Sequence, residues 1–250
     1  MRKNDFKAID LLLALVLLTR LPLPHLPKAS FARQSRAVWA FPLAGAVVGL
    51  LAVITAALAL MWWPPAIAAG LTLVAQVTLT GAMHEDGLAD TADGFWGGFE
   101  PARRLEIMKD SKIGTYGVLA LILGLGLRWS ILAALFSAGA IWAPVALAAL
   151  SRAAMPVMMA RMPNARGSGL AHTVGRPSLT AATFGILIAL LLGVLCMGWA
   201  ILGAALILVP LLIGLRRLAM AKIGGQTGDV LGTTQQLSEI ALGLMLLALI

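Results

Sequence analysis

Residues 37–83 read AVWAFPLAGAVVGLLAVITAALALMWWPPAIAAGLTLVAQVTLTGAM, a run without an acidic or basic side chain. Segments 37–61 and 66–83 are each long enough to cross a bilayer as a helix, which takes about 20 apolar residues. Between them stands Trp62-Trp63-Pro64-Pro65, an uncharged turn whose aromatic rings suit a membrane interface. The stretch therefore predicts a hairpin of two membrane-spanning helices.

Two more pairs of apolar runs repeat this pattern along the chain. Segments 118–136 and 140–159 are joined by an uncharged turn, and segments 180–197 and 199–215 are joined at Gly198. We therefore predict an all-α fold, a polytopic transmembrane helical bundle with about six spans in three hairpins plus short N- and C-terminal apolar segments.

The two terminal apolar runs leave the count open at seven or eight spans. Residues 8–18 are too short to cross and carry Asp10, which favours an interfacial or re-entrant position. Residues 240–250 are equally short, although a helix starting near Val230 would reach into the core. No fixed repeat and no Ser/Pro-rich linker divides the chain, so residues 1–250 are expected to form a single domain.

The charged loops all fall on one side of this arrangement. By the excess of Lys and Arg, that side is the cytoplasm. The loops comprise residues 19–36, 84–117, 161–179 and 216–236.

The composition excludes other classes of protein. Of 250 residues, 60% are hydrophobic and 12% are charged, whereas soluble domains are roughly 45–50% apolar. The strand-length alternation of a membrane β-barrel is absent. The net charge of +8 comes from basic residues spread over short loops rather than from a basic run with interleaved aromatics. We therefore expect the lipid bilayer and no nucleic acid as a partner, and the oligomeric state, including a homo-oligomer, stays open.

The acidic residues concentrate directly after the first hairpin, where residues 84–98 read HEDGLADTADGFWGG. In a helix, Asp86, Asp90 and Asp93 would share one stripe, and like charges at that spacing repel. A cation over the stripe would relieve this repulsion. Oxygen ligands without cysteine favour Mg²⁺ or Mn²⁺, which bridges phosphates well. The alternative is a solvated loop with scattered acids.

Two other segments contain residues suited to binding anions. Arg103, Glu106 and Asp110 would share one helical face, as an anion clamp with a further acid or as an amphipathic interfacial helix with ordinary ion pairs. The sequence GGQTGD at 224–229 precedes an apolar helix, and such a helix start can present backbone N–H groups to phosphate. It lacks the Gly-Lys-Ser/Thr of a P-loop, so alone it is a weak signal. Arg128, inside a predicted span, either faces a polar cavity or snorkels.

Taken together, these segments resemble the cobalamin synthase family, the adenosylcobinamide-GDP ribazoletransferases. The block HxDGLADTxDG followed by LEIMKDSxxG is specific, and the matching pieces follow family order over nearly the whole chain. The pieces are TRLP at 19–22, FPL at 41–43, residues 84–94, LEIMKDSKIG at 105–114, and residues 224–232 with Glu239. Glu85 departs from the family pattern, and its role is left open.

The resemblance implies a multi-pass enzyme of the bacterial cytoplasmic (inner) membrane with its site on the cytoplasmic side. It would join α-ribazole, or its 5′-phosphate, to adenosylcobinamide-GDP and release GMP, with Mg²⁺ as the cofactor. Asp86, Asp90 and Asp93 would hold the metal, Arg103 and Lys109 would stabilise phosphate charge, and Asp110 is the first choice for a base. A nucleotide or ribazole phosphate would lie on the loop of Gly225, Gln226, Thr227, Gly228 and Asp229.

Two other functions fit the sequence less well. A CDP-alcohol phosphatidyltransferase also uses acidic residues and Mg²⁺, but its motif has Ala-Arg where this chain has Ala89-Asp90. A cation transporter would place acids inside the spans, whereas these acids cluster in a predicted loop beside Arg and Lys.

Overall fold

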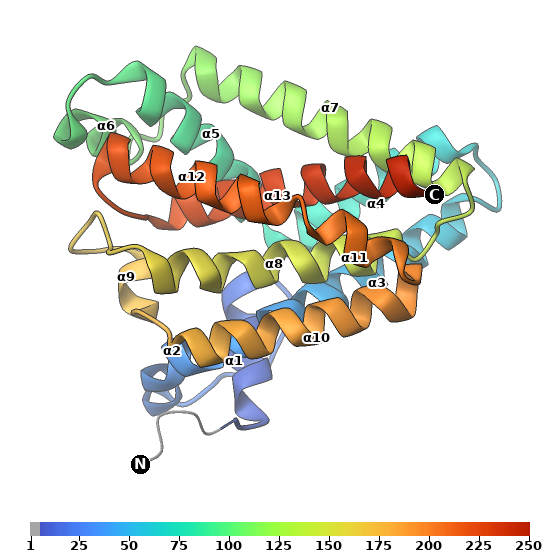
Figure 1. Cartoon of the computed structure of the whole chain (residues 1–250), viewed down its shortest axis with the longest axis horizontal. Helices are drawn as coiled ribbons and strands as arrows, with labels where there is room; N and C mark the ends of the chain where they lie inside the picture. Colours follow the sequence, from blue (N-terminus) through green and yellow to red (C-terminus); the bar gives the residue numbers. More distant parts are fainter. Residues whose placement is uncertain (1–5) are drawn as a thin grey trace.

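The computed structural model describes residues 6–250, and the regular structure of this part of the chain is helical. The long helices run roughly along the long axis of the molecule, and their connections gather at its two ends (Figure 1). In chain order the elements are α1 Ile9–Leu18, η1 Lys28–Arg33, α2 Gln34–Ala37, η2 Val38–Ala40, α3 Phe41–Ala59, α4 Pro65–Thr80, α5 Met83–Gly97, α6 Pro101–Ile107, α7 Thr115–Ser137, α8 Ala143–Arg161, α9 Leu170–Val174, α10 Leu179–Met197, α11 Ala200–Ala205, α12 Leu208–Ile223 and α13 Gly228–Leu249.

Six helical stretches of the described chain are long and apolar enough to cross a membrane. The count becomes seven if α4 and α5, which meet at a bend of 86°, are one broken span. The predicted all-α membrane bundle with about six spans is confirmed. The six stretches are Lys28–Ala59, α7, α8, α10, Ala200–Ile223 and α13.

One predicted terminal segment and one predicted span differ from the structure. The end of the chain is not a short apolar segment, because α13 is a helix of 22 residues starting at Gly228. Its first half carries polar side chains that hydropathy counts against a span, yet Thr234, Gln235 and Gln236 are buried inside the bundle. The predicted crossing at 66–83 is also shorter, since α4 ends at Thr80.

The break between α4 and α5 falls at two consecutive residues with left-handed backbone conformations, Gly81 and Ala82. Gly81 takes a left-handed backbone conformation with φ of 63°, which glycine adopts at little cost. A Cβ at this position would also lie 2.7 Å from Nε of Arg20. The bend directs α5 away from the line of α4, so we treat the acidic helix as lying outside the six spans.

Helix α8 forms the centre of the bundle. Buried residues make up 94% of its most apolar stretch, and it packs against α3, α10 and α13 (Figure 1). Gly45 and Gly49 of α3 allow the closest approach, because a Cβ on either would lie 2.2 or 2.5 Å from the α8 backbone. Small residues at such contacts let membrane helices pack backbone to backbone.

Helices α5 and α13 pack against each other equally closely. A Cβ on Gly87 would lie 2.8 Å from the carbonyl oxygen of Asp229, and one on Gly232 would lie 3.2 Å from the carbonyl oxygen of His84. The hydroxyl of Thr233 donates to the carbonyl of Gly87 over 3.0 Å. This contact brings the acidic helix beside the start of α13, and so joins two segments that are far apart in the sequence.

A buried polar network holds α5 from its other side. The guanidinium of Arg128 on α7 donates to Glu85 at 2.7 Å and to Glu239 of α13 at 2.9 Å. It also donates to the amide oxygens of Gln76 and Gln236. Arg128 therefore faces a polar interior rather than snorkelling, and its charge is compensated as a buried arginine requires.

The three charged loops that follow residue 84 come together at one end of the molecule (Figure 1). Arg104 donates to the carbonyl of Lys222 over 2.8 Å, and Lys222 donates to the carbonyl of Phe95 over 2.9 Å. Arg166 reaches the carbonyl of Leu105 over 3.1 Å. These bonds join loops 84–117, 161–179 and 216–236, the arrangement that the uncharged turns predict.

Candidate active site

The acidic segment is helical, as its spacing allows. Helix α5 runs from Met83 to Gly97, so its three aspartates do follow one stripe. Their exposure falls along the helix: Asp86 is exposed, Asp90 is half-buried and Asp93 is buried. The three carboxylates therefore meet different environments.

Asp93 has a structural role in this arrangement. One of its carboxylate oxygens accepts the backbone N–H of Gly114 at 2.7 Å and the other accepts that of Gly117 at 2.8 Å. These amides belong to the start of α7, where the first turn of a helix has no backbone partners. A carboxylate there also interacts favourably with the helix dipole. Because both carboxylate oxygens already accept a hydrogen bond, we do not count Asp93 among the ligands of a cation.

Asp229, which was predicted only as part of the glycine loop, lies close enough to Asp86 and Asp90 to interact with both. Burial and the neighbouring carboxylates of Asp86, Asp229 and Asp93 raise the pKa of Asp90 to about 7. This electrostatic strain is the kind that a bound cation relieves. Within residues 6–250, no three Asp, Glu, His or Cys side chains stand close enough to hold an ion by themselves.

Arg166 was missed by the sequence analysis, which treated the loop at 161–179 only as basic charge facing the cytoplasm. Its guanidinium donates to the carboxylate of Asp229 over 3.0 Å. Thr227 donates to the same carboxylate oxygen over 3.1 Å. The sequence around a single loop arginine does not show which carboxylate it will pair with, so only the folded chain identifies the pair of Arg166 and Asp229.

The glycine loop is built onto the same 161–179 loop. The N–H of Gln226 donates to the carbonyl of Pro163, and the N–H of Ala165 donates to the carbonyl of Gln226, both over 2.9 Å. Gly225 is required by this contact, since a Cβ there would lie 2.4 Å from the Pro163 carbonyl oxygen. Thr227 caps α13 by accepting the N–H of Val230. Gly228 instead faces open space.

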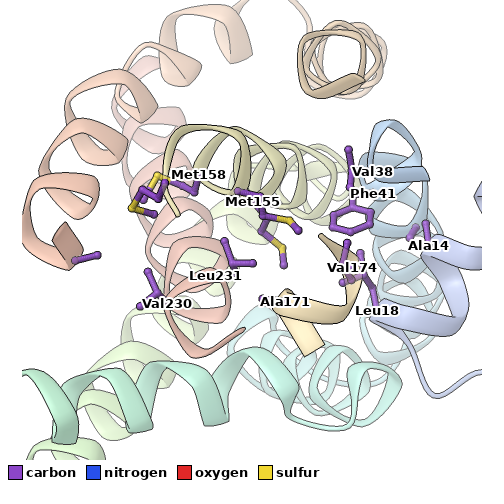
Figure 2. Packing of buried hydrophobic residues seen from close by; sticks show 14 of the residues in the cluster. Ala14, Leu18, Val38, Phe41, Met155, Met158, Ala171, Val174, Val230 and Leu231 are labelled. Carbon is purple, nitrogen blue, oxygen red and sulfur yellow. The ribbon is translucent and has the colours of Figure 1, made fainter. Parts of the chain in front are cut away.

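A cavity of about 280 Å³ opens between these elements. Its polar rim includes Asp86, Arg166, Thr227 and Asp229, together with Gly228. Behind the rim the wall is apolar, and Figure 2 shows some of its side chains converging from separate elements. The apolar lining includes Leu17, Leu18, Phe41, Met83, Met155, Met159, Ala171, Val174 and Leu231.

Arg103 and Lys109, predicted to stabilise phosphate charge, and Asp110, predicted as the base, do not belong to this rim. Arg103 is paired with Glu106 at 3.0 Å, and both side chains are 66% exposed, as in an ordinary surface helix. Lys109 is exposed, and so is Asp110, whose carboxylate accepts the N–H of Lys112. None of the three lines the cavity.

Comparison with known proteins identifies the family. The family model of cobalamin-5-phosphate synthase matches residues 10–248. The chain belongs to this family. The predicted resemblance is confirmed over almost the full length of the chain, and the match spans both the acidic helix and the glycine loop that line the cavity.

Individual members of the family agree with this assignment. The adenosylcobinamide-GDP ribazoletransferase of Brucella canis is 43% identical over 246 residues, covering 93% of this chain and 94% of that protein. The enzyme of the same name from Mesorhizobium japonicum is 46% identical over 239 residues, covering 93% and 90%. That from a Sinorhizobium species is 45% identical over 236 residues, covering 90% of each. No solved structure matches the chain.

Proposed function

We propose that this chain is an adenosylcobinamide-GDP ribazoletransferase. The observation that carries the proposal is the family match over residues 10–248, with relatives of that name covering more than nine-tenths of the chain. The cavity with its acidic and basic rim supplies a place for the chemistry. Two substrates would meet there, adenosylcobinamide-GDP as donor and α-ribazole or its 5′-phosphate as acceptor.

The reaction forms one bond to phosphorus and breaks another. The acceptor hydroxyl oxygen attacks the phosphorus that carries the cobinamide, and the bond from that phosphorus to the bridging oxygen of the diphosphate breaks. The electron pair leaves with GMP, and the hydroxyl proton is released. Such a transfer depends on positioning and on neutralising phosphate charge rather than on a covalent enzyme intermediate.

We further propose Mg²⁺ as the cofactor, held by Asp86 and Asp90 with Asp229 beside them. Burial of Asp90 and the crowding of these carboxylates, which together raise the pKa of Asp90 to about 7, support a cation there. Mg²⁺ needs only one or two protein carboxylates and completes its shell with water and substrate phosphate oxygens. When bound, it would neutralise the diphosphate charge. Arg166 would fix Asp229 in place through their ion pair.

The remaining basic residues are assigned a weaker role. Arg103 and Lys109 are exposed on and just after α6, at the end of the molecule where the charged loops gather (Figure 1). We propose that they attract the anionic donor without touching the reacting phosphorus. The enzyme would lie in the bacterial inner membrane with this end toward the cytoplasm, where the positive-inside rule places it.

The test is turnover by the purified protein. Incubation with adenosylcobinamide-GDP, α-ribazole and Mg²⁺ is expected to yield cobalamin and GMP in equal amounts. The Asp86→Asn protein serves as the control for a contaminating activity. Absence of both products from well-folded protein would overturn the proposed function, and turnover without any added or bound divalent cation would overturn only the Mg²⁺ assignment.

A further inference from the structure

We propose that the cavity behind the acidic rim binds the dimethylbenzimidazole base of the acceptor, with the ribose directed toward Asp86 and Asp229. This inference rests on the proposed function and assigns one of the two substrates to one place. The donor diphosphate would then lie outside the rim, over the acids.

The size of the cavity excludes the larger candidate. Pockets that enclose a drug-sized ligand measure roughly 300–1,000 Å³, and this one is about 280 Å³. A riboside matches this size, whereas the corrinoid macrocycle of the donor does not. The cobinamide portion must therefore stay outside the cavity, which leaves the acceptor base or the guanine of the donor as occupants.

The wall of the cavity favours the benzimidazole over guanine. Leu18, Phe41, Met155, Ala171 and Leu231 approach from α1, α3, α8, α9 and α13 (Figure 2). Methionine sulfur packs well against aromatic rings, and a dimethylated benzimidazole presents an apolar edge to such a wall. The guanine of the donor instead has a carbonyl, an amino group and a ring N–H that would each need a partner to be buried.

Among the polar side chains that line the cavity, His84 lies beside the apolar wall and matches the single free ring nitrogen of the base. His84 lines the cavity and is 1% exposed, and neither of its ring nitrogens has a hydrogen-bond partner. The imidazole ring carries an N–H that can donate, and the unsubstituted nitrogen of the riboside's base accepts one hydrogen bond.

Two further unpartnered atoms stand at the rim, where the ribose would emerge. Nε of Arg166 and Oε1 of Gln226 are both buried without a hydrogen-bond partner, and both residues line the cavity. A donor and an acceptor at this point suit the ribose hydroxyl groups. Buried polar atoms without partners are costly, so a ligand that forms hydrogen bonds with His84, Arg166 and Gln226 is favoured.

Ligand binding to the wild-type protein in detergent tests the assignment without any variant. Equilibrium dialysis with labelled α-ribazole, in the absence of donor, is expected to show saturable binding that excess guanosine or GDP does not displace. The riboside of unmethylated benzimidazole should bind about tenfold more weakly, since each buried methyl contributes to affinity. Displacement by guanosine, or equal binding of the two ribosides, would overturn the inference.

A histidine variant locates the site. His84→Ala should weaken α-ribazole binding roughly five- to tenfold, the loss expected for one buried hydrogen bond, and should raise KM for α-ribazole but not for adenosylcobinamide-GDP. The matched control is His25→Ala, because His25 is exposed and lies outside the cavity. If His84→Ala raises KM for the donor alone, the inference fails while the proposed function stands. If the wild-type protein forms no cobalamin from the two substrates, the proposed function itself fails.

Discussion

Arg128 and Glu85 form a buried ion pair, with the guanidinium of Arg128 on α7 donating to the carboxylate of Glu85 on α5 over 2.7 Å. Glu85 directly precedes Asp86, so the pair fixes the first turn of the acidic helix. Glu239 on α13 compensates the same guanidinium at 2.9 Å. The single side chain of Arg128 therefore links α5 and α13, the two helices that bring Asp86 and Asp229 to the cavity rim.

Arg128→Leu is expected to destabilise the protein by about 3–5 kcal/mol, because it removes the guanidinium to which two buried carboxylates are hydrogen-bonded. Thermal unfolding in detergent measures this effect. The control is Arg103→Ala, which removes an exposed ion pair and should cost less than about 1 kcal/mol. Equal stability of the two variants would show that the buried network does not support the fold.

The aspartates are expected to separate into two groups. Asp86→Asn and Asp90→Asn should each lower kcat at least about a hundredfold while the protein folds normally, since charge neutralisation at the diphosphate contributes several kcal/mol. Asp93→Asn should mainly lower thermal stability, because Asp93 caps α7. Turnover and melting temperature measured on all three decide this. A stable but inactive Asp93→Asn protein would show that Asp93 is needed for catalysis rather than for the fold.

Two glycines in one loop should respond differently to the same change. Gly228→Val adds a side chain in open space at the cavity lining, so the protein should fold and bind α-ribazole at least tenfold more weakly. Gly225→Val should instead reduce the yield of folded protein, because its Cβ would collide with the carbonyl of Pro163. Yield, melting temperature and ribazole affinity are the measurements. Normal affinity in folded Gly228→Val protein would leave the loop as a helix start only.

Cation binding by the substrate-free protein should weaken as the pH falls. The pKa of Asp90 is raised to about 7, and a metal requires the ionised carboxylate. Asp90 is mostly ionised at about pH 8 and mostly protonated at about pH 6, so Mn²⁺ affinity should drop roughly tenfold between them. Titration of free Mn²⁺ by electron paramagnetic resonance measures it. The Asp90→Asn protein should lose this dependence, and a flat profile in the wild type would contradict the assignment.

The orientation in the membrane is testable with reporter fusions. Fusions after Gly98 and after Gly225 should both report the cytoplasm, because the loops that contain them are joined by hydrogen bonds such as that from Arg104 to the carbonyl of Lys222. A fusion at Gly139, in the uncharged turn between α7 and α8, should report the opposite side. Opposite locations for Gly98 and Gly225 would overturn the arrangement of the spans.

The sequence by itself determined the class of fold, the end at which the charged loops gather and the helical stripe of acids. These properties depend on local quantities: the length of an apolar run, the absence of charge in a turn and the 3.6-residue period of a helix. It also contained the family motifs, which match over residues 10–248.

Only the tertiary structure decided which side chains meet. Asp93 accepts backbone N–H groups of α7, Asp229 lies near Asp90, and Arg128 pairs with Glu85 inside the bundle. Each of these pairs joins helices that are distant in sequence, so no local period encodes it. The contact of α5 with α13 depends on Gly87, whose missing side chain permits the approach, and a backbone-to-backbone packing of this kind exists only once the whole bundle has formed.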